Sequence, residues 1–270
     1  PPSGTNNIYV VHQAKSVGTI DPPATETIAK TFSGNVTMSG TNTLSGTTTV
    51  SGALTASSGV TLSGTTPTLT IGDAGAEDAK IVFDGNAQDY HIGLDDSTDD
   101  LVIGLGSSLG TTAHIVTDEA GHVTMPLQSA FCAQANADLS NIPSNNSEQT
   151  VKLGTEIFDL NADFNTSTFT FTAPVTGKYL LTFSATLANV DTNATLIAIY
   201  IDTSNRDYAD SNTFGINGYS ADEPRVEVSQ TVVADMDASD TAKVTVRQFE
   251  GTAQMDVTDD TCHFSGYLVA

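Results

Sequence analysis

The sequence predicts an all-β protein, in which an elongated, intertwined homotrimeric β shaft is followed by a denser C-terminal head. Two patterns lead to this expectation: an apolar residue every six positions in residues 32–66, and alternating apolar and polar residues in residues 127–270. The 270-residue chain is long enough for one to three domains. We divide it into an N-terminal neck or attachment segment (1–31), a hexad-repeat shaft (32–66), a β-meander shaft segment (67–126) and the head.

The shaft prediction depends on a six-residue repeat. The apolar set that recurs at this spacing is Phe32, Met38, Leu44, Val50, Ala56 and Leu62, and most members are followed by Ser-Gly. A helix would need apolar residues at spacings of three and four. Thr and Val favour extended chain, and Gly allows a tight turn. Each hexad is therefore expected to form a short strand and a corner.

One such ribbon cannot bury its apolar stripe alone. A single-chain left-handed β-helix needs three hexads per coil, so this segment would make about two coils, fewer than the roughly three repeats that a solenoid requires. Several chains that wrap around a common axis would bury their stripes together, most simply as a trimer. The alternative is a disordered Ser/Gly/Thr linker.

The segments on either side of the hexads differ in composition. In the neck, Ile8–Val11 is a candidate strand, and Pro22-Pro23 excludes a helix. Residues 67–126 hold short apolar pieces separated by turn residues, which predicts a β-meander: 69–71, 81–83, 90–94, 101–105, 114–116 and 122–125. Large side chains are so few there that we expect this segment also to fold only within the oligomer.

The middle segment resembles a known class of protein. Its stretch FDGNAQDYHIGLDDSTDDLVIGLG, followed by AGHVTMP, is similar to segments that recur in fibre proteins of tailed bacteriophages. The resemblance covers about sixty residues. It implies a fibre shaft, and it makes other virion proteins the expected partners of the N-terminus.

The charge balance restricts the partners. The chain carries 9 Lys and Arg residues and a net charge of -23, so we expect neither nucleic acid nor an anionic membrane surface as a partner. No apolar run reaches the roughly 18 residues of a membrane span, and we expect no membrane insertion. Because the chain opens with Pro-Pro, we expect further sequence upstream.

The C-terminal segment predicts two packed β-sheets. Alternation places Phe169 and Phe171 on one face of a strand, and Pro174–Gly177 has the composition of a turn. Five further stretches have the composition of strands: Tyr179–Leu187, Leu196–Ile201, Val226–Val233, Lys243–Phe249 and His263–Val269.

This segment resembles a C1q-like domain, the compact trimeric jelly roll shared with tumour necrosis factor. The residues that carry the resemblance are Ser129–Phe131, Phe158, the run Phe169–Phe183 (FTFTAPVTGKYLLTF) and Phe264–Leu268 (FSGYL). Ala238-Ser239-Asp240 departs from the family, which often has Gly-Asp there. The resemblance implies a jelly-roll head that forms homotrimers.

Cys132 and Cys262 are the two cysteines, 130 residues apart. This spacing is not a metal-binding pattern, and the sequence alone favours neither a disulfide nor buried thiols. In the C1q-like fold the first and last strands lie side by side, so the resemblance makes a disulfide between the two cysteines plausible.

No pattern of residues predicts an enzyme. The five His residues are scattered, no G-x-S-x-G occurs, and no organic cofactor is expected. The resemblance implies that loops 188–194, 234–241 and 256–261 share one end of the head. Their carboxylates are candidate ligands for a structural calcium ion: Asp191, Asp235, Asp237, Asp240, Asp256, Asp259 and Asp260.

The leading functional interpretation is a trimeric bacteriophage fibre, located in the virion and extracellular, whose head binds a host cell-surface receptor, for example a glycan. Aromatic and amide side chains of the long 203–223 connection are the candidate contacts: Tyr208, Asn212, Asn217 and Tyr219. One alternative is a structural capsid or tail decoration fibre whose head only drives trimerisation. Another is a bacterial trimeric adhesin. A depolymerase fibre is the weakest alternative.

Overall fold

The structure is a computed structural model that describes residues 33–210 and 219–270. Its chain divides into two units at residue 67, residues 1–67 and 68–270. Within the described residues every regular element is a β-strand, as the sequence predicts. No helix in this part of the chain is long and apolar enough to cross a membrane. The predicted neck, residues 1–31, lies outside the described residues.

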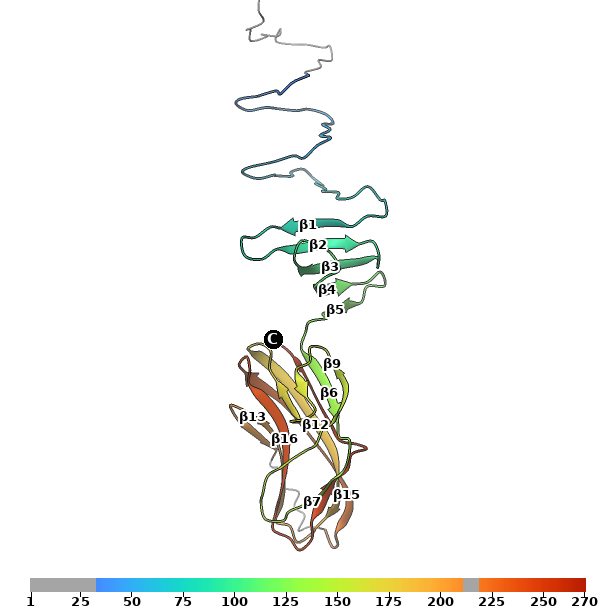
Figure 1. Cartoon of the computed structure of the whole chain (residues 1–270), viewed down its shortest axis with the longest axis vertical. Coiled ribbons are helices and arrows are strands. Elements are labelled where there is room, and N and C mark those ends of the chain that lie inside the picture. Colours follow the sequence, from blue (N-terminus) through green and yellow to red (C-terminus); the bar gives the residue numbers. More distant parts are fainter. Residues whose placement is uncertain (1–32, 211–218) are drawn as a thin grey trace, which may run out of the picture. The chain divides into compact units, whose positions relative to one another are not determined.

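Residues 33–67 form an extended trace with regular corners (Figure 1). Bends fall at Gly34, Gly40 and Gly46, six residues apart, and the latter two have φ angles of 86° and 93°. These are left-handed conformations that favour glycine. The predicted corners are therefore present. The short strands between them are not formed in the single chain, since a strand needs a neighbour to hydrogen-bond with.

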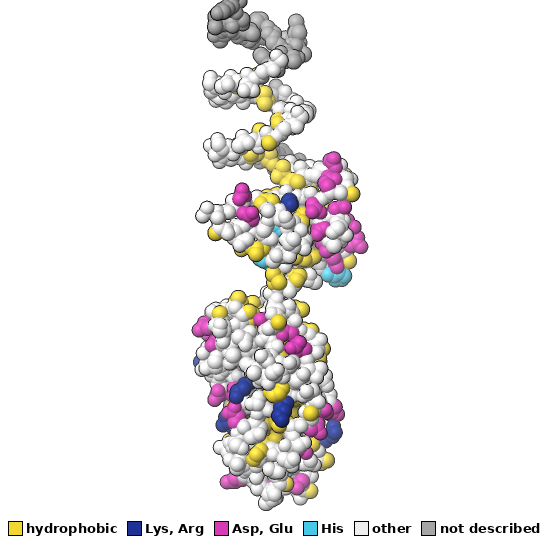
Figure 2. All heavy atoms as spheres, viewed as in Figure 1, with side chains coloured by type: hydrophobic (Ala, Val, Ile, Leu, Met, Phe, Trp, Pro, Cys, Tyr) yellow, Lys and Arg dark blue, Asp and Glu magenta, His cyan; other side chains and the backbone are white. Residues whose placement is uncertain are grey.

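The apolar stripe of the hexads has no cover in the single chain. Leu44 is 65% exposed and Leu54 is 75% exposed. Figure 2 shows the hydrophobic side chains lying along the bare trace. An exposed apolar stripe with a fixed period is consistent with burial of these side chains against other chains. The trimeric shaft itself remains a prediction.

The middle segment is the predicted meander. Its five antiparallel strands pair in chain order: β1 (Ala79–Phe83), β2 (Tyr90–Asp95), β3 (Asp100–Leu105), β4 (Ala113–Thr117) and β5 (Val123–Thr124). The apolar piece 69–71 is not a strand. Val102 is the only large apolar side chain of the meander that is fully buried, whereas Phe83 is 55% exposed. The meander thus has little core of its own, as expected.

The head consists of two antiparallel sheets (Figure 1). One sheet has the order β10 (Phe164–Asn165), β11 (Thr170–Thr172), β16 (Thr241–Phe249), β13 (Leu196–Thr203) and β14 (Asp207–Asp210), with β8 (Gln149–Thr150) also paired to β16. The other has the order β7 (Leu139–Ile142), β17 (Met255–Val257), β12 (Gly177–Val190), β18 (His263–Leu268), β6 (Ala130–Gln134) and β9 (Thr155–Asp159), with β15 (Glu223–Met236) also paired to β12.

The head core lies between the two sheets and is built on aromatic side chains. Phe131 stacks on Phe164 and Phe171, with ring centroids 5.2 and 4.6 Å apart, and meets Phe264 edge-on at 5.1 Å. The period-two alternation of the strands sends these rings inward and their neighbours outward. The two-sheet prediction for the head is confirmed.

Candidate interaction surface

The outward face of the seven-stranded sheet carries a patch without charged side chains. In one row of the ladder Leu180 lies opposite both Val233 and Tyr267, and Tyr267 lies opposite Ala130. In the next row Thr182 lies opposite Thr231 and Ser265, Ser265 lies opposite Cys132, and Cys132 lies opposite Phe158. We call these nine residues the neutral face.

The neutral face is large, apolar and open. Val233 is 58% exposed, Tyr267 48% and Phe158 47%. Leu160 adjoins the patch, since its backbone N–H donates to the carbonyl of Ala130 at 3.0 Å, and it is 52% exposed. Opposite side chains of an antiparallel pair lie about 5 Å apart, so these groups form one continuous surface. Contiguous exposed apolar surface in a chain of net charge -23 marks a site of interaction.

Charged residues begin at the borders of this patch. On one side the next row of the ladder pairs Lys178 with Asp235, and the Lys178 ammonium contacts the Asp235 carboxylate. On the other side Ser184 pairs with Ser229 in the next outward row, and Glu227 lies opposite Thr186 in the row beyond it. An apolar centre with a charged rim is the usual composition of a protein–protein interface.

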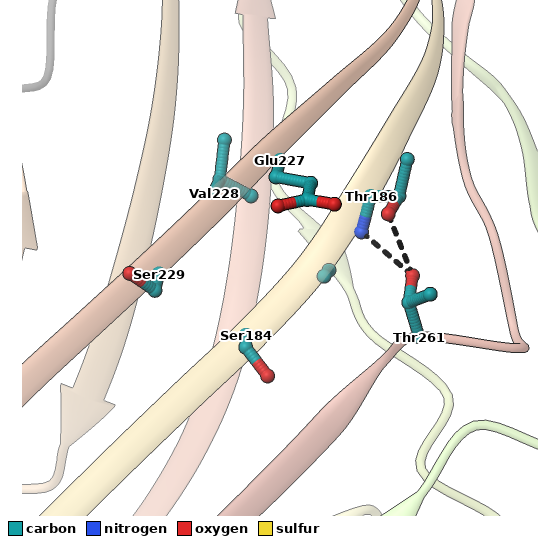
Figure 3. A pocket seen from close by; sticks show the side chains of 7 residues that line it. Ser184, Thr186, Glu227, Val228, Ser229 and Thr261 are labelled. Atoms are coloured by element: carbon teal, nitrogen blue, oxygen red, sulfur yellow. Dashed lines mark hydrogen bonds between the residues drawn. The ribbon is translucent and has the colours of Figure 1, made fainter.

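A polar groove of about 430 Å³ lies beyond the neutral face, between β12 and β15 (Figure 3). The Thr261 hydroxyl accepts a hydrogen bond from the Thr186 N–H at 3.0 Å and donates one to the Thr186 hydroxyl at 2.8 Å. Figure 3 shows the Glu227 carboxylate beside Thr186, and the hydroxyls of Ser184 and Ser229 at the other end. The groove therefore offers hydroxyls and one carboxylate as hydrogen-bonding groups.

The predicted disulfide is wrong, because Cys132 and Cys262 are both free thiols. The first and last strands, β6 and β18, do lie side by side, but Cys132 faces Ser265 and the carbonyl of Cys262 accepts from the N–H of Ala135. This offset of three residues separates the cysteines by about 10 Å along the strands, beyond the roughly 7 Å that a disulfide allows. It also sends Cys132 outward and Cys262 into the core, where burial raises the Cys262 pKa to about 12.

The seven predicted calcium ligands do not lie at one end of the head. Gly177 pairs with Met236 and Val190 pairs with Glu223, so loop 234–241 and loop 188–194 lie at opposite ends of β12. Thirteen steps along a strand separate them by about 43 Å. Loop 256–261 shares the Val190 end, since Ala188 pairs with Asp256. The prediction of a single cluster is therefore wrong, because β12 and β15 run antiparallel over their whole length.

Five of the seven carboxylates are engaged within the protein: Asp191, Asp235, Asp240, Asp256 and Asp260. Asp240 accepts hydrogen bonds from the Asp237 N–H at 2.7 Å and from the Ser204 hydroxyl at 2.8 Å. The Asp256 carboxylate accepts from Asn141 N–H and Asn189 Nδ2, at 2.7 and 2.8 Å. Asp260 lies 3.8 Å from Arg225. Within residues 33–210 and 219–270, no group of three or more His, Cys, Asp or Glu side chains is placed to hold a metal ion.

Asp191 is the most tightly held of these groups. It is fully buried and accepts hydrogen bonds from the backbone N–H of Asn193 at 2.8 Å, of Ala253 at 2.7 Å and of Thr252. Burial alone raises its pKa, but these N–H donors outweigh burial and lower the pKa to about 2. Asp191 thus joins loop 191–193 to loop 250–253, which is a structural role.

The predicted receptor contacts separate into three cases. Tyr208 packs against the head core, and Arg206 lies over its ring at 5.9 Å. Tyr219 is 45% exposed and is available to a partner. Asn212 and Asn217 lie outside the described residues. The structure thus leaves Tyr219 as the accessible candidate on the described part of this loop.

Sequence reasoning missed the neutral face. Its signal is the alternate positions of SQTVV (229–233) and FSGYLV (264–269), where the outward residues are Ser, Thr, Val and Tyr with no charge. Alternation shows which residues share a face of one strand. It does not show that β15, β12, β18, β6 and β9 place their uncharged positions in adjacent rows.

Comparison with known proteins finds a matching family model and similar solved structures. The family model of the C1q domain matches residues 130–269. Among solved structures, the globular domain of the zebrafish complement 1qA protein is 16% identical, covering 53% of this chain and 98% of that chain at a TM-score of 0.37. Murine APRIL at pH 5.0 is 10% identical, covering 53% of this chain and 99% of that chain at a TM-score of 0.38. No curated protein matches the chain at a significant level.

Proposed function

The chain belongs to the C1q-domain family, and from this premise we propose that it is a non-enzymatic, homotrimeric fibre protein whose head self-associates through the neutral face. The observation that carries the proposal is the uncharged face itself, on a head that is otherwise strongly acidic. Burial of Val233, Tyr267 and Phe158 between copies would remove their apolar surface from water. This contributes a favourable free energy of about 25 cal/mol for each Å² of apolar surface buried.

The N-terminal half supports the same assembly. Its hexad side chains, such as Leu44 and Leu54, are exposed in a single chain. Three chains in register would cover one another's stripes, and a trimeric head would set that register. The head and the shaft therefore need the same oligomeric state.

We propose further that the protein is a tailed-bacteriophage fibre, located in the virion and extracellular. The support is the amino-acid sequence of residues 83–106 and 120–126, which resembles segments of phage fibre proteins. On this proposal other virion proteins hold the N-terminus. The head binds a host surface receptor, and three head sites on one stalk gain avidity even when each site is weak.

The self-association proposal is tested by light scattering on the full chain with two matched variants. We expect a mass about three times the 28.0 kDa of one chain. Tyr267→Asp places a charge in the centre of the neutral face at a residue 48% exposed in one chain, and we expect it to give monomers. Tyr219→Asp changes a Tyr that is 45% exposed outside that face, and we expect it to stay trimeric.

Cys132 supplies an independent readout of the same interface. It lies within the neutral face, between Ser265 and Phe158. We expect a maleimide to label Cys132 slowly in the trimer and quickly in the Tyr267→Asp monomer. A monomeric wild-type chain, or equal labelling of Cys132 in both proteins, would overturn the interface.

Receptor binding is tested separately from assembly. Labelled wild-type trimer on a bacterial glycan array is expected to bind selected glycans, and Tyr219→Ala is expected to weaken that binding while the trimer mass stays the same. If the trimer forms but binds neither glycans nor bacterial cells, the structural decoration fibre becomes the better interpretation.

A further inference from the structure

The outward face of the six-stranded sheet carries a cluster of charged side chains, and this sheet is the one that does not carry the neutral face. Asp202 of β13 lies opposite Asp207 of β14 on one side and Lys243 of β16 on the other. Glu148, just before β8, accepts hydrogen bonds from Lys243 at 2.9 Å and from Arg247 at 2.7 Å. Both cations of the cluster are therefore engaged by one carboxylate.

Asp202 is the unusual member of this cluster. It is only 8% exposed, and its Oδ2 accepts a hydrogen bond from the Thr245 hydroxyl at 2.5 Å. Its Oδ1 is buried and has no hydrogen-bond partner. A buried carboxylate oxygen without a partner is costly to the folded state, and it needs a donor that the protein itself does not supply.

A cavity of about 270 Å³ opens beside Asp202. Asp207 and Thr241 also line it, as do Glu148 and Lys243. This volume lies just below the roughly 300–1,000 Å³ of pockets for drug-sized ligands, so the cavity suits a small group.

The charges around the cavity do not balance. When all are ionised, Glu148, Asp202 and Asp207 carry three negative charges, against one on Lys243 at the cavity and one on Arg247, which contacts Glu148. Burial raises the pKa of Asp202, and the neighbouring charges of Glu148 and Asp207 act in the same direction. One monovalent cation would balance the set. A metal ion fits less well, because no three acidic or His side chains of the described chain are placed to hold one.

We propose that this cavity binds a primary ammonium group, with Asp202 Oδ1 as its buried acceptor and the Asp207 carboxylate as its second. A primary ammonium has three N–H donors and one positive charge. Thr241 supplies a hydroxyl at the cavity wall for the third donor. An amino sugar and a lysine side chain both carry this group. The site lies on the other sheet from the neutral face, so it does not depend on how the head assembles.

The test is saturation-transfer NMR on the full-length protein, with dissociation constants from titration. The two ammonium probes are glucosamine and Nα-acetyl-lysine amide. N-acetylglucosamine is the control for glucosamine, because acetylation removes the positive charge of its amine. We expect at least one ammonium probe to bind, and N-acetylglucosamine to bind at least tenfold more weakly than glucosamine. The tighter of the two ammonium probes identifies the source of the group.

Two variants locate the binding. Asp202→Asn keeps the shape of the side chain but removes the charge, and we expect at least a tenfold loss of affinity for the ammonium probe. Asp207→Asn changes an exposed residue, so we expect this variant to fold and to lose affinity several-fold even if Asp202→Asn fails to fold. Asp260→Asn, an exposed carboxylate paired with Arg225, is the control that leaves binding unchanged.

Two results would overturn the proposal. One is equal binding of glucosamine and N-acetylglucosamine, or no binding of either ammonium probe. The other is unchanged affinity in folded Asp202→Asn and Asp207→Asn proteins. Neither result would bear on the mass of the trimer, so the failure of this site and the failure of the proposed assembly are distinguishable.

Discussion

Asp191→Asn is the substitution whose effect on stability follows most directly from the structure. The carboxylate is fully buried and accepts hydrogen bonds from three backbone N–H groups, of Asn193, Thr252 and Ala253. An Asn amide would present an N–H₂ group or a weaker neutral acceptor to these donors. Charged acceptors contribute about twice as much as neutral ones, so the variant loses stability and loosens the join between loops 191–193 and 250–253.

The magnitude comes from the pKa of Asp191. Lowering it from 3.8 to about 2 corresponds to about 2.5 kcal/mol of folded-state stability at neutral pH, at roughly 1.4 kcal/mol for each tenfold change in proton affinity. The folded-state pKa lies below the unfolded-state pKa. The contribution is therefore complete above about pH 4 and is lost as the pH falls toward 2.

The assay is urea denaturation followed by circular dichroism, at one fixed chain concentration because oligomers unfold in a concentration-dependent way. We expect Asp191→Asn to be about 2–3 kcal/mol less stable than wild type at pH 7, and the difference to shrink between pH 4 and pH 2. The exposed control Asp260→Asn is expected to change stability by about 0.5 kcal/mol or less at every pH. A wild-type advantage over Asp191→Asn that is the same at pH 7 and pH 2.5 would refute the argument.

Three further predictions concern the core, the shaft and the thiols. Phe131→Ala removes the ring that contacts Phe164, Phe171 and Phe264 and is expected to cost about 3–5 kcal/mol in urea denaturation, whereas a loss below 1 kcal/mol would contradict its central place in the core. Gly46→Ala places a side chain at a φ of 93° and is expected to cost about 1–2 kcal/mol per chain, seen as a lower melting temperature of the shaft. The control Gly52→Ala lies at a corner without positive φ and with open space around it, so equal melting temperatures for the two variants would count against the corner geometry. Cys262 is buried with a pKa raised to about 12, so iodoacetamide at pH 8 is expected to leave it unmodified until the head unfolds, and mass spectrometry of the native protein that found it alkylated would contradict its burial.

Much of the fold was predictable from the sequence, because the determining patterns are local. The hexad spacing places corners at Gly40 and Gly46. The separation of short apolar runs by turn residues predicts the five-stranded meander. Alternation from Phe171 to Phe183 predicts a two-sheet head with the rings of Phe171, Tyr179 and Phe183 inside. The prediction that Phe169 shares a strand face with Phe171 is wrong, because Phe169 lies in the preceding turn with a φ of 57°. Each of these patterns acts within one strand or one turn, where side-chain period and backbone conformation depend only on near neighbours.

The candidate sites were less predictable, because they depend on the register between distant strands. A resemblance that places β6 beside β18 does not say that Cys132 faces Ser265. A list of acidic loops does not say that β12 and β15 run antiparallel over fourteen residues and hold Asp191 and Asp235 at opposite ends. A shift of one residue moves every side chain to the other face of the sheet.

The sequence by itself determined the class of the protein: all β, acidic, with a repeating segment that cannot bury its apolar stripe alone and a head that belongs to the C1q-domain family. Only the tertiary structure decided which surfaces exist. It assembled the neutral face from five strands far apart in the chain, and it left Asp202 Oδ1 without a partner beside a small cavity. The physical reason is that burial and pairing in a sheet are set by contacts between residues that lie from 33 to 137 positions apart, and no local pattern encodes those contacts.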